Sequence, residues 1–474
     1  MLIYLCVNSA FVSVARLDFG VFGGCQSITG YGLQKMISQE YKELAKWAIQ
    51  YALSKGCSDA RVSVYSRTGD SFEYRDTQLD RLEQSTEGGM GIQLFVDGRY
   101  ASYSTNRLDK KELERYIANS VESTRFLAKD EFRKLPQPAR YYRGGGENLD
   151  IYDNDVEKIS VDDKLALIKN TAAEVYGSDP RLISVVAGYE DGKSSSFMAT
   201  SNGFEGEADA TYFGLSASTS MKGEGDARPS DYWYDVSVFW DRLQKQGIGK
   251  TALERTVRKL GQEKINSGVY PMLIDNTHSY NLLSPVMSAM TGGNIQQKNS
   301  FLINKIGESI ASEKLTLIDD PHIPRARGAR RFDGEGVATV RRAVIEKGVL
   351  RTYYIDTYYG GKLGMEPTVQ SPSILTCEHG GKNFDQLLAS MDKGIWVTGF
   401  NGGNSNSTTG DFSYGIEGFL VEKGKAVKPV NEMNITGNLL TLWKNVVEVG
   451  NDPLLITAQR IPSILFDKVS FSGK

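Results

Sequence analysis

The apolar residues that follow position 38 repeat with the spacing of an amphipathic helix, and Gly56 stands where such a helix would end. The positions of the predicted buried face are Tyr41, Leu44, Ala45, Ala48, Ile49, Ala52 and Leu53. A second helix is predicted from Asp109, because Asp109 and Glu112 have the spacing of a capping box and an apolar face follows from Leu113. These two helices bracket a segment in which the hydrophobic pattern changes.

Between the helices, polar and apolar residues alternate, which is typical of strands with one buried face. Runs at 61–65 and 71–75 stand on either side of Gly69-Asp70, so we expect two strands with a break between them. Two further runs flank Asp97-Gly98, a dipeptide that favours the tight turn of a β-hairpin. The first unit is thus predicted as a helix, several antiparallel strands and a second helix.

A related order of elements follows a stretch at 134–150 that has the composition of a linker, with two prolines and three consecutive glycines. The predicted elements are, in order, a helix capped by Ser160 and Asp163, hairpin turns at Asp191-Gly192 and Asn202-Gly203, an aromatic strand at 232–240 and a helix through Leu260. The pattern suggests a structural echo of the first unit.

From about Gly268 onward, β-branched and aromatic runs are separated by glycine turns. The predicted strands are 336–345, 349–354 after a turn at Lys347-Gly348, 394–400 and 415–422, with a flexible loop at 401–407 and helices at 282–290 and 439–447. Such patterning favours a curved antiparallel sheet or a barrel-like domain with few helices.

The fold class is therefore α+β, with N-terminal units of antiparallel strands flanked by helices and a mostly antiparallel C-terminal domain. A chain of 474 residues exceeds what one hydrophobic core supports, so several domains are expected. We predict an N-terminal extension at 1–35, an α+β domain at 36–135, a middle α+β domain at 150–265 and a β-rich domain at 268–474. The extension lacks the basic start of a signal peptide.

The charge balance argues against direct nucleic-acid binding, because the net charge is −3 and the pI is about 5.9. One basic cluster, at 325–331, is interpreted as a solvated loop or as a local anion or partner contact. Four scattered cysteines form no disulfide framework or CxxC motif, which favours a reducing cytoplasm. No apolar stretch approaches the ~20 residues that a membrane span requires.

The sequence contains no visible catalytic constellation. Its three histidines are His278, His322 and His379, and no two of them have the close helical spacing of a zinc peptidase. Cys377 and His379 could face one way on a strand, but two ligands do not make a metal site. Neither a G-x-S-x-G elbow nor a phosphate-binding loop occurs. We therefore predict no catalytic residue, no metal ligand and no cofactor.

An ordered set of motifs in the last domain resembles the TldD/PmbA family, whose members were first labelled modulators of DNA gyrase. The similar segments are 281–294, 300–312, 317–321, Asp333-Gly-Glu-Gly-Val337, 409–413, 417–422, Gly437-Asn438 and 450–452, with a further resemblance at 89–105. The similarity covers most of the chain after Met36. It implies membership of a metallopeptidase family.

In the TldD branch, the central helix carries H-E-x-x-x-H, which holds zinc and the general base. By resemblance, these three positions fall on Ser284, Pro285 and Ala289. None of these side chains offers an imidazole or a carboxylate. This departure resembles the PmbA/TldE branch, so the resemblance implies a subunit without the zinc motif. Pro285 is expected to lie in the first turn, with the helix starting near residues 281–284.

The resemblance implies a subunit of a TldD/TldE-type metallopeptidase complex that acts in the proteolysis of extended peptides. Its expected partner is a TldD-like subunit, and a homodimer is left open. Two alternatives remain: a peptidase that acts alone by another mechanism, and an interaction protein that modulates DNA gyrase. Whether the chain is itself an enzyme is left open by the sequence.

Overall fold

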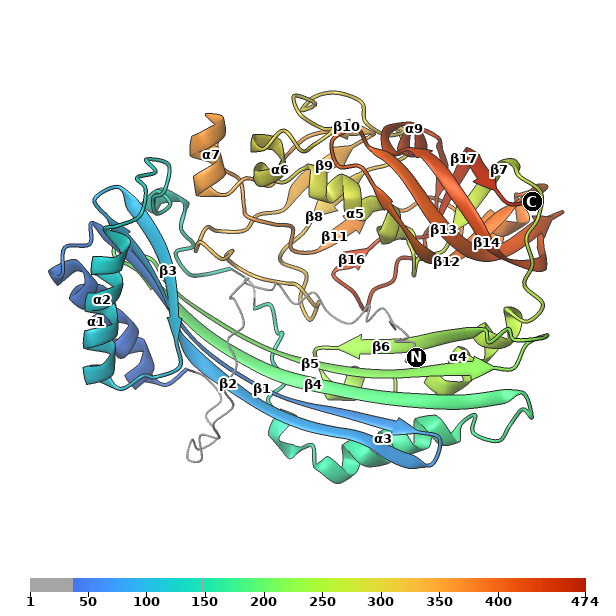
Figure 1. The fold of residues 1–474 in the computed structure, drawn as a ribbon, viewed down its shortest axis with the longest axis horizontal. Helices are drawn as coiled ribbons and strands as arrows, with labels where there is room; N and C mark the ends of the chain where they lie inside the picture. The colour runs from blue at the N-terminus through green and yellow to red at the C-terminus, as the bar shows by residue number, and fades with distance from the viewer. Residues whose placement is uncertain (1–36, 147) are drawn as a thin grey trace.

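The computed structural model describes residues 37–146 and 148–474, so the predicted N-terminal extension lies outside the described residues. The fold is α+β, as the sequence predicted, and most strand pairings are antiparallel. A long curved sheet is built from the first half of the chain, and a barrel with a smaller sheet is built from the second half (Figure 1).

The first sheet has six strands in the order β3-β2-β1-β4-β5-β6. Its strands are β1 (Asp59–Arg75), β2 (Gln78–Val96), β3 (Arg99–Thr105), β4 (Leu182–Thr200), β5 (Glu205–Met221) and β6 (Ser230–Ser237). Strands β1 and β4 pair in register from Arg61 opposite Thr200 to Arg75 opposite Val186. Segments expected in the first and middle domains thus share one sheet, while the predicted domain boundaries stay a prediction.

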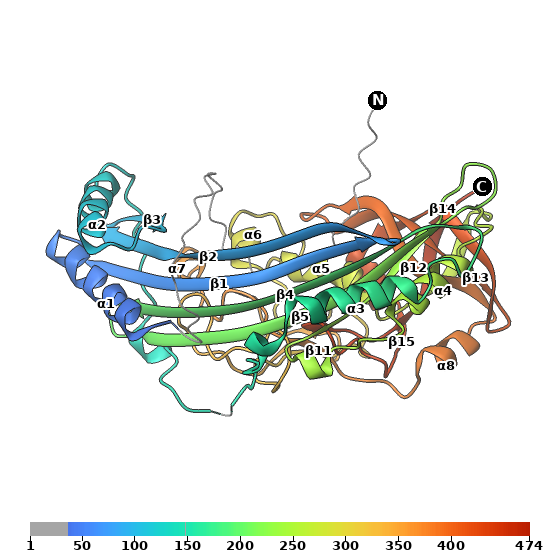
Figure 2. The same ribbon diagram turned by 90° about the horizontal axis from the view of Figure 1, so that it is seen from below.

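Four helices cover one face of this sheet (Figures 1 and 2). They are α1 (Gln39–Ser54), α2 (Lys110–Thr124), α3 (Val161–Ala173) and α4 (Ile248–Arg258), and short 3-10 helices occur at Pro138–Arg140, Val156–Lys158 and Trp240–Arg242. Helices α1 and α2 bury an apolar cluster against one end of the sheet, and α3 and α4 bury another against the other end. The even-numbered residues of β1 face both clusters, Val62 at one end and Phe72 at the other.

Several local signals are confirmed. Asp97 and Gly98 have φ values of 50° and 76° between β2 and β3, as the predicted hairpin turn requires. Ser160 and Asp163 form a reciprocal capping box on α3. The side chain of Asp109 caps α2 by accepting from the main-chain N–H groups of Lys111 and Glu112.

Two predicted breaks are wrong. Gly69-Asp70 lies inside β1, and Asp191-Gly192 lies inside β4, where the two dipeptides stand opposite each other. A Cβ on Gly69 would lie 2.6 Å from the carbonyl oxygen of Asp191, and one on Gly192 would lie 2.4 Å from the ring of Tyr212. The glycines are therefore needed for close packing within a continuous sheet rather than for a turn.

The second half of the chain forms a closed barrel, as the barrel-like prediction anticipated. Its sheet has the order β14-β13-β12-β7-β17-β15, and pairing of β14 with β17 closes it. The strands are β7 (Gly268–Ile274), β12 (Lys393–Ser405), β13 (Asp411–Glu422), β14 (Lys425–Asn438), β15 (Val446–Val449) and β17 (Ile464–Ser472). A small sheet beside the barrel contains β8 (Leu317–Asp319), β9 (Arg342–Glu346), β10 (Val349–Leu350), β11 (Leu375–Cys377) and β16 (Gln459–Arg460).

The helices of this half are short. They are α5 (Ser279–Ala289), α6 (Gly292–Gln296), α7 (Thr357–Leu363), α8 (Phe384–Ala389) and α9 (Leu439–Lys444). The helix predicted at 439–447 ends early, because Val446 begins strand β15. The strand predicted at 336–345 starts only at Arg342. The loop predicted at 401–407 is largely strand, with a bulge between Phe400 and Gly403 at which Gly402 and Gly403 have positive φ.

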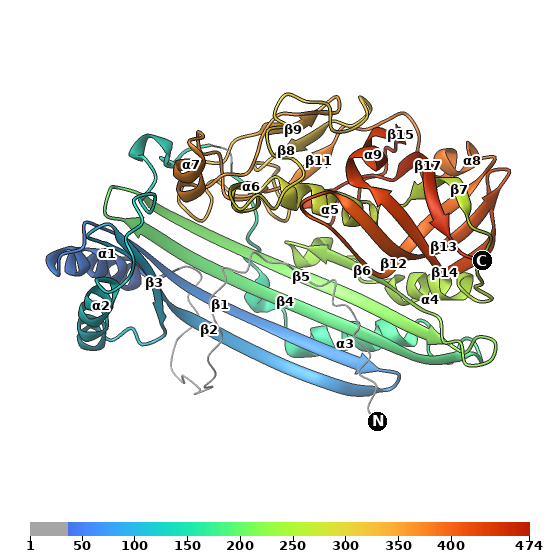
Figure 3. The same cartoon turned by 45° about the horizontal axis from the view of Figure 1, so that its top comes forward.

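The second half of the chain lies over the concave side of the long sheet, opposite its helices (Figures 1 and 3). In the part of the chain that the structure describes, no helix has the length and apolar character needed to cross a bilayer. Helix α5 lies where the central motif of the resemblance was placed, packed in the main core of the second half.

Candidate functional site at helix α5

Helix α5 begins earlier than predicted, in the turn that follows β7. The main-chain N–H groups of His278 and Ser279 both donate to the carbonyl oxygen of Asp275 at 3.0 Å. The hydroxyl of Ser279 donates to the same oxygen and to the carbonyl of Pro462, each at 2.8 Å. These contacts start the helix at Ser279 rather than near residues 281–284.

Pro285 consequently lies inside the helix, not in its first turn. A proline has no N–H, so the carbonyl of Asn281 loses the donor that a regular helix would supply from four residues ahead. The residue that carries this carbonyl, Asn281, is exposed. The expectation of a first-turn proline was wrong because side-chain contacts of Ser279 with distant residues set the helix start.

The structure does not bring together the side chains at the three positions that the resemblance matched to the zinc motif. Ser284 lies on the exposed face of α5 with Asn281 and Ser288, whereas Ala289 is only 1% exposed and belongs to the main core cluster. Five residues along an α-helix correspond to a rotation of about 140°, so side chains at 284 and 289 point apart. Pro285 is half-buried between them. A hydroxyl, an imino ring and a methyl group in this arrangement do not fit a zinc ion.

The carboxylate of Asp275 contacts the side chains of Thr277 and His278 at the start of α5. Its Oδ1 accepts from Thr277 Oγ1 at 2.5 Å and lies 3.0 Å from His278 Nδ1. Burial alone would raise the pKa of Asp275, but His278, Thr277 and the positive charge of Arg255 outweigh it and lower the pKa to about 2. The carboxylate is therefore charged, and His278 is held by it at the start of α5.

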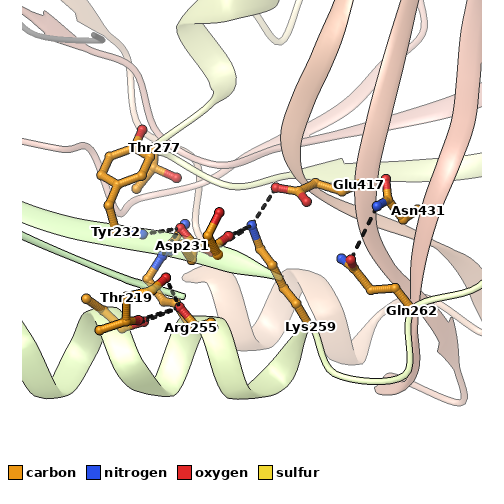
Figure 4. A network of polar contacts seen from close by, with 12 residues as sticks. Thr219, Asp231, Tyr232, Arg255, Lys259, Gln262, Thr277, Glu417 and Asn431 are labelled. Atoms are coloured by element: carbon orange, nitrogen blue, oxygen red, sulfur yellow. Dashed lines mark hydrogen bonds and ion pairs between the residues drawn. The ribbon is translucent and has the colours of Figure 1, made fainter. Parts of the chain in front are cut away.

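Arg255 connects this cluster to a buried ion network between α4 and the barrel (Figure 4). Its Nε lies 3.2 Å from Oδ1 of Asp231 on β6. Lys259 Nζ lies 3.1 Å from Oδ2 of the same aspartate and 2.5 Å from Oε1 of Glu417 on β13. The side chains of Asp231 and Lys259 are each 6% exposed, so two cations and two carboxylates balance one another away from water. The network ties the long sheet to the barrel.

The motif at 333–337 forms a second junction between the two halves. The carboxylate of Asp333 accepts from the main-chain N–H groups of Glu335 and Gln370 at 2.9 and 3.1 Å. Glu335 in turn accepts from the main-chain N–H and the hydroxyl of Thr357, both at 2.9 Å. Burial raises the pKa of Glu335, and the positive charge of Arg61 on β1 partly offsets that rise. Nη1 of Arg61 is buried without a hydrogen-bond partner among the described residues.

The remaining candidates from the sequence do not form a metal site. Cys377 is buried, which raises the pKa of its thiol to about 12, whereas His379 is exposed. The two side chains therefore do not share an environment. Within residues 37–146 and 148–474, no group of three or more His, Cys, Asp or Glu side chains is placed to hold a metal ion.

The basic cluster at 325–331 makes contacts within the chain. The guanidinium of Arg330 donates to the carbonyls of Ser371 and Pro372 and to the hydroxyl of Ser373. Arg325 pairs with Asp150 and lies over the ring of Phe239. Arg330 thus connects two loops of the second half, and Arg325 connects the second half to the linker at 134–150. Neither arginine belongs to a free solvated loop.

Sequence reasoning missed Asp275, Asp231, Arg255 and Lys259 as members of these networks. Glu335 and Glu417 were noticed only as parts of motifs that carried the resemblance. Lys259 and Glu417 are 158 positions apart in the chain, so no local pattern could pair them. A charged residue at a predicted buried position, such as Asp231 next to the aromatic run at 232–234, is the signal that could have drawn attention to the network.

The architecture defines an α+β protein with a long curved sheet and a barrel, in which helix α5 carries no His, Cys, Asp or Glu side chain. Models of the PmbA/TldA metallopeptidase match in all three of its domains: domain 1 at residues 60–124, the central domain at 154–260 and the C-terminal domain at 267–473. The chain belongs to the PmbA/TldD family.

Three related proteins are similar to this chain over most of their length. The crystal structure of a protein from Bacteroides thetaiotaomicron, described as a modulator of DNA gyrase, is 55% identical, with a TM-score of 0.91 over 93% of this chain and 100% of that one. A metalloprotease PmbA homologue of Haemophilus influenzae is 28% identical over 93% of this chain and 98% of its own length. TldE of Thermococcus kodakarensis, at 18% identity, has the same fold, with a TM-score of 0.80 over 91% of this chain and 100% of that one.

Proposed function

We propose that this chain is the PmbA/TldE-type subunit of a cytoplasmic TldD/TldE-type peptidase complex, and that a TldD-like partner supplies the zinc chemistry. The observation that carries the proposal is the chemistry at Ser284, Pro285 and Ala289 on an otherwise intact helix α5. The packing of α5 is retained through Leu282, Val286 and the rest of its buried face. The helix thus keeps a structural role while lacking ligands for a metal ion.

An extended peptide can be held by strand addition to the edge of a sheet, through main-chain hydrogen bonds. This mode of binding needs no catalytic side chain on the subunit that supplies the edge. The long sheet ends in strands β3 and β6, each of which has one described strand beside it.

The test is to purify the protein and a TldD-like chain with an intact H-E-x-x-x-H motif, separately and mixed. We expect a stable mixed complex, peptide cleavage that exceeds that of the TldD-like chain alone, and zinc held by the TldD-like chain. Substituting glutamine for the motif glutamate of the TldD-like chain should abolish cleavage. The matched change here, Pro285→Gln, should leave cleavage by the complex within about twofold.

The same experiment separates the alternatives. If the two chains do not associate and cleavage is unchanged on mixing, the proposal is wrong. Metal-dependent cleavage by the isolated protein would instead favour a peptidase that acts alone, as the names of its metalloprotease relatives suggest. Capture of purified gyrase subunits by the isolated protein, with no effect on peptide cleavage, would favour the gyrase-modulating alternative.

A further inference from the structure

A small cavity lies at one end of the barrel, where strands β7, β12 and β14 begin and strands β13 and β17 end. Its volume is about 270 Å³. The segments that form it are far apart in the sequence, and the C-terminal end of the chain lies beside them (Figure 1). We call it the lysine cavity, because its lining includes Glu263, Tyr270, Lys264, Lys393, Lys428 and Lys474.

Hydrogen bonds fix the wall of the lysine cavity to the barrel. The main-chain N–H of Lys474 donates to the carbonyl of Ile265 at 2.9 Å, and the hydroxyl of Ser267 donates to the carbonyl of Lys474 at 3.0 Å. The phenol of Tyr270 donates to the carbonyl of Asn266 at 3.1 Å, and its ring packs against the main core. The wall is therefore part of the folded barrel rather than a free loop.

Two of the lysines in this cavity converge on one carboxylate. Lys428 Nζ pairs with Oε1 of Glu263, and Lys474 Nζ lies 3.6 Å from Oε2 of the same side chain. The hydrogen bond from Lys428 lowers the pKa of Glu263, and the positive charges of Lys428 and Lys474 add to this effect. The surroundings of Glu263 therefore favour a negative charge.

The lysines of the cavity outnumber the carboxylates that pair with them. Glu263 is shared by two lysines, and Glu432, outside the lining, pairs with Lys264 at 3.2 Å. Lys393 makes no ion pair among the described residues, although Glu422 stands opposite it in the pairing of β12 and β13, and its Nζ lies 6.0 Å from the centre of the Tyr270 ring. Two of the four positive charges are therefore not balanced by an ion pair. The excess is local, because the whole chain has a net charge of −3.

We propose that the lysine cavity binds a small, multiply charged anion of the phosphate class, of which inorganic pyrophosphate is a simple example. A phosphate group carries about 1.5–2 negative charges at neutral pH, which matches the two unbalanced lysines better than the single charge of a carboxylate. Lysine binds phosphate as a point charge, so no fixed bidentate geometry is needed. The volume of about 270 Å³ is below the roughly 300–1,000 Å³ of sites for drug-sized ligands, which favours a small anion over a nucleotide.

A bound anion would connect segments that meet only at this end of the barrel. Lys393 belongs to β12, Lys428 belongs to β14, and Lys474 follows β17. An anion held between these three ammonium groups would remove their mutual repulsion and stabilise the folded chain by mass action. The proposal does not rest on the proposed peptidase role.

The first test is calorimetric titration of the purified full chain with inorganic pyrophosphate at low ionic strength. The wild type should bind one pyrophosphate per chain, and added salt should weaken the binding. Lys393→Gln should weaken it at least about tenfold, because one charged contact is lost. Glu263→Gln should tighten it at least about threefold, because the competing carboxylate is removed. The matched control is Lys425→Gln, an exposed lysine of β14 outside the lining, which should change the affinity by less than about twofold.

The outcomes of this titration are distinct. Absence of binding to the wild type, or equal losses in Lys393→Gln and Lys425→Gln, would overturn the proposal. Glutarate carries two carboxylates and no phosphate, so binding as tight as that of pyrophosphate would show that the cavity does not select phosphate. ADP should bind more weakly than pyrophosphate, and tighter binding of ADP would show that the site takes a nucleotide instead of a small anion.

Chemical protection of lysines maps the site in the wild-type protein, so it does not depend on the folding of a variant. A bound anion favours the charged ammonium form, which does not react with acetic anhydride. With saturating pyrophosphate, acetylation measured by mass spectrometry should be at least about threefold slower at Lys393 and Lys428 and unchanged at Lys425. Equal protection of all three lysines would show that pyrophosphate only screens the surface charge, and the proposal would be wrong.

Discussion

Asp70 of β1 and Asp191 of β4 lie directly opposite each other, and Lys164 of α3 places its Nζ 2.6 Å from a carboxylate oxygen of each. The hydroxyl of Tyr189 donates to Asp191 at 2.7 Å. The side chains of Lys164 and Asp191 are 8% and 7% exposed, so the three charges meet largely out of water. Helix α3 is therefore held on the sheet by a buried cation as well as by its apolar face.

Replacing this cation should be strongly destabilising. Lys164→Met would leave two carboxylates facing each other at a buried site, and we expect the free energy of unfolding to fall by about 3–5 kcal/mol. The measurement is denaturant unfolding at neutral pH. Lys169→Met on the exposed side of the same helix is the control, and it should change the free energy by less than about 0.5 kcal/mol. Equal effects of the two substitutions would show that the ion cluster contributes nothing.

Asp275 should make the folded protein sensitive to acid. Its pKa of about 2 lies below the ordinary value of 3.8, so its contribution is complete above pH 4 and is lost as the pH falls towards 2. The contribution should be on the order of 2 kcal/mol. In Asp275→Asn, unfolding free energy should therefore vary less with pH between 2 and 4 than in the wild type. Asp241→Asn, at an exposed position, should keep the wild-type slope.

Restoring the family motif on α5 should not create a zinc site. In the triple variant Ser284→His, Pro285→Glu, Ala289→His, the second imidazole would replace the methyl group of Ala289, which is 1% exposed and packed in the main core, so it has no free space in which to reach an ion. We expect no stoichiometric zinc by metal analysis after dialysis. Ala289→His alone should destabilise by about 1–3 kcal/mol through overpacking, whereas Ser284→His should be nearly neutral. One tightly bound zinc per triple-variant chain would show that the core around residue 289 can accommodate an imidazole, and the prediction would be wrong.

Removing Lys259 should loosen the junction between the sheet and the barrel. Lys259→Met leaves Asp231 with only Arg255 and leaves Glu417 without its cation, and we expect a loss of about 3 kcal/mol or more. Lys264→Met is the matched control, because Lys264 pairs with Glu432 at an exposed site and should contribute less than about 1 kcal/mol. Hydrogen exchange should show the loss of protection concentrated on β6 and β13 in the Lys259 variant.

Local signals predicted local structure well. The hairpin at Asp97-Gly98 and the capping box at Ser160 depend on residues within a few positions, and both were identified from the sequence. Gly69-Asp70 and Asp191-Gly192 have the same composition as turn dipeptides but lie within strands. These two dipeptides differ from turn dipeptides in their contacts with Lys164 and Tyr212, which belong to other elements. The residues next to each dipeptide in the sequence do not reveal these contacts.

The candidate site was predictable to a similar extent. The motif resemblance indicated a helix in the segment that forms α5, whereas the assignment of the zinc-motif positions to Ser284, Pro285 and Ala289 stays a prediction. The start of the helix was misplaced, because it depends on contacts of Ser279 with Pro462, far along the chain. The ion pair of Lys259 with Glu417 was missed for the same reason, because an ion pair between distant segments produces no periodic pattern in the sequence.

The pairing of β1 with β4 also constrains how the molecule is made. During synthesis, β1 leaves the ribosome long before Thr200 of β4. The edge of β1 that pairs with β4 therefore has no partner strand until more than a hundred residues have been added after the hairpin of β1 and β2. Closing so long a loop is slow, and the waiting strand is exposed to wrong pairing in the meantime. A nascent chain stalled before β4 should therefore be a substrate for chaperones rather than a stably folded unit.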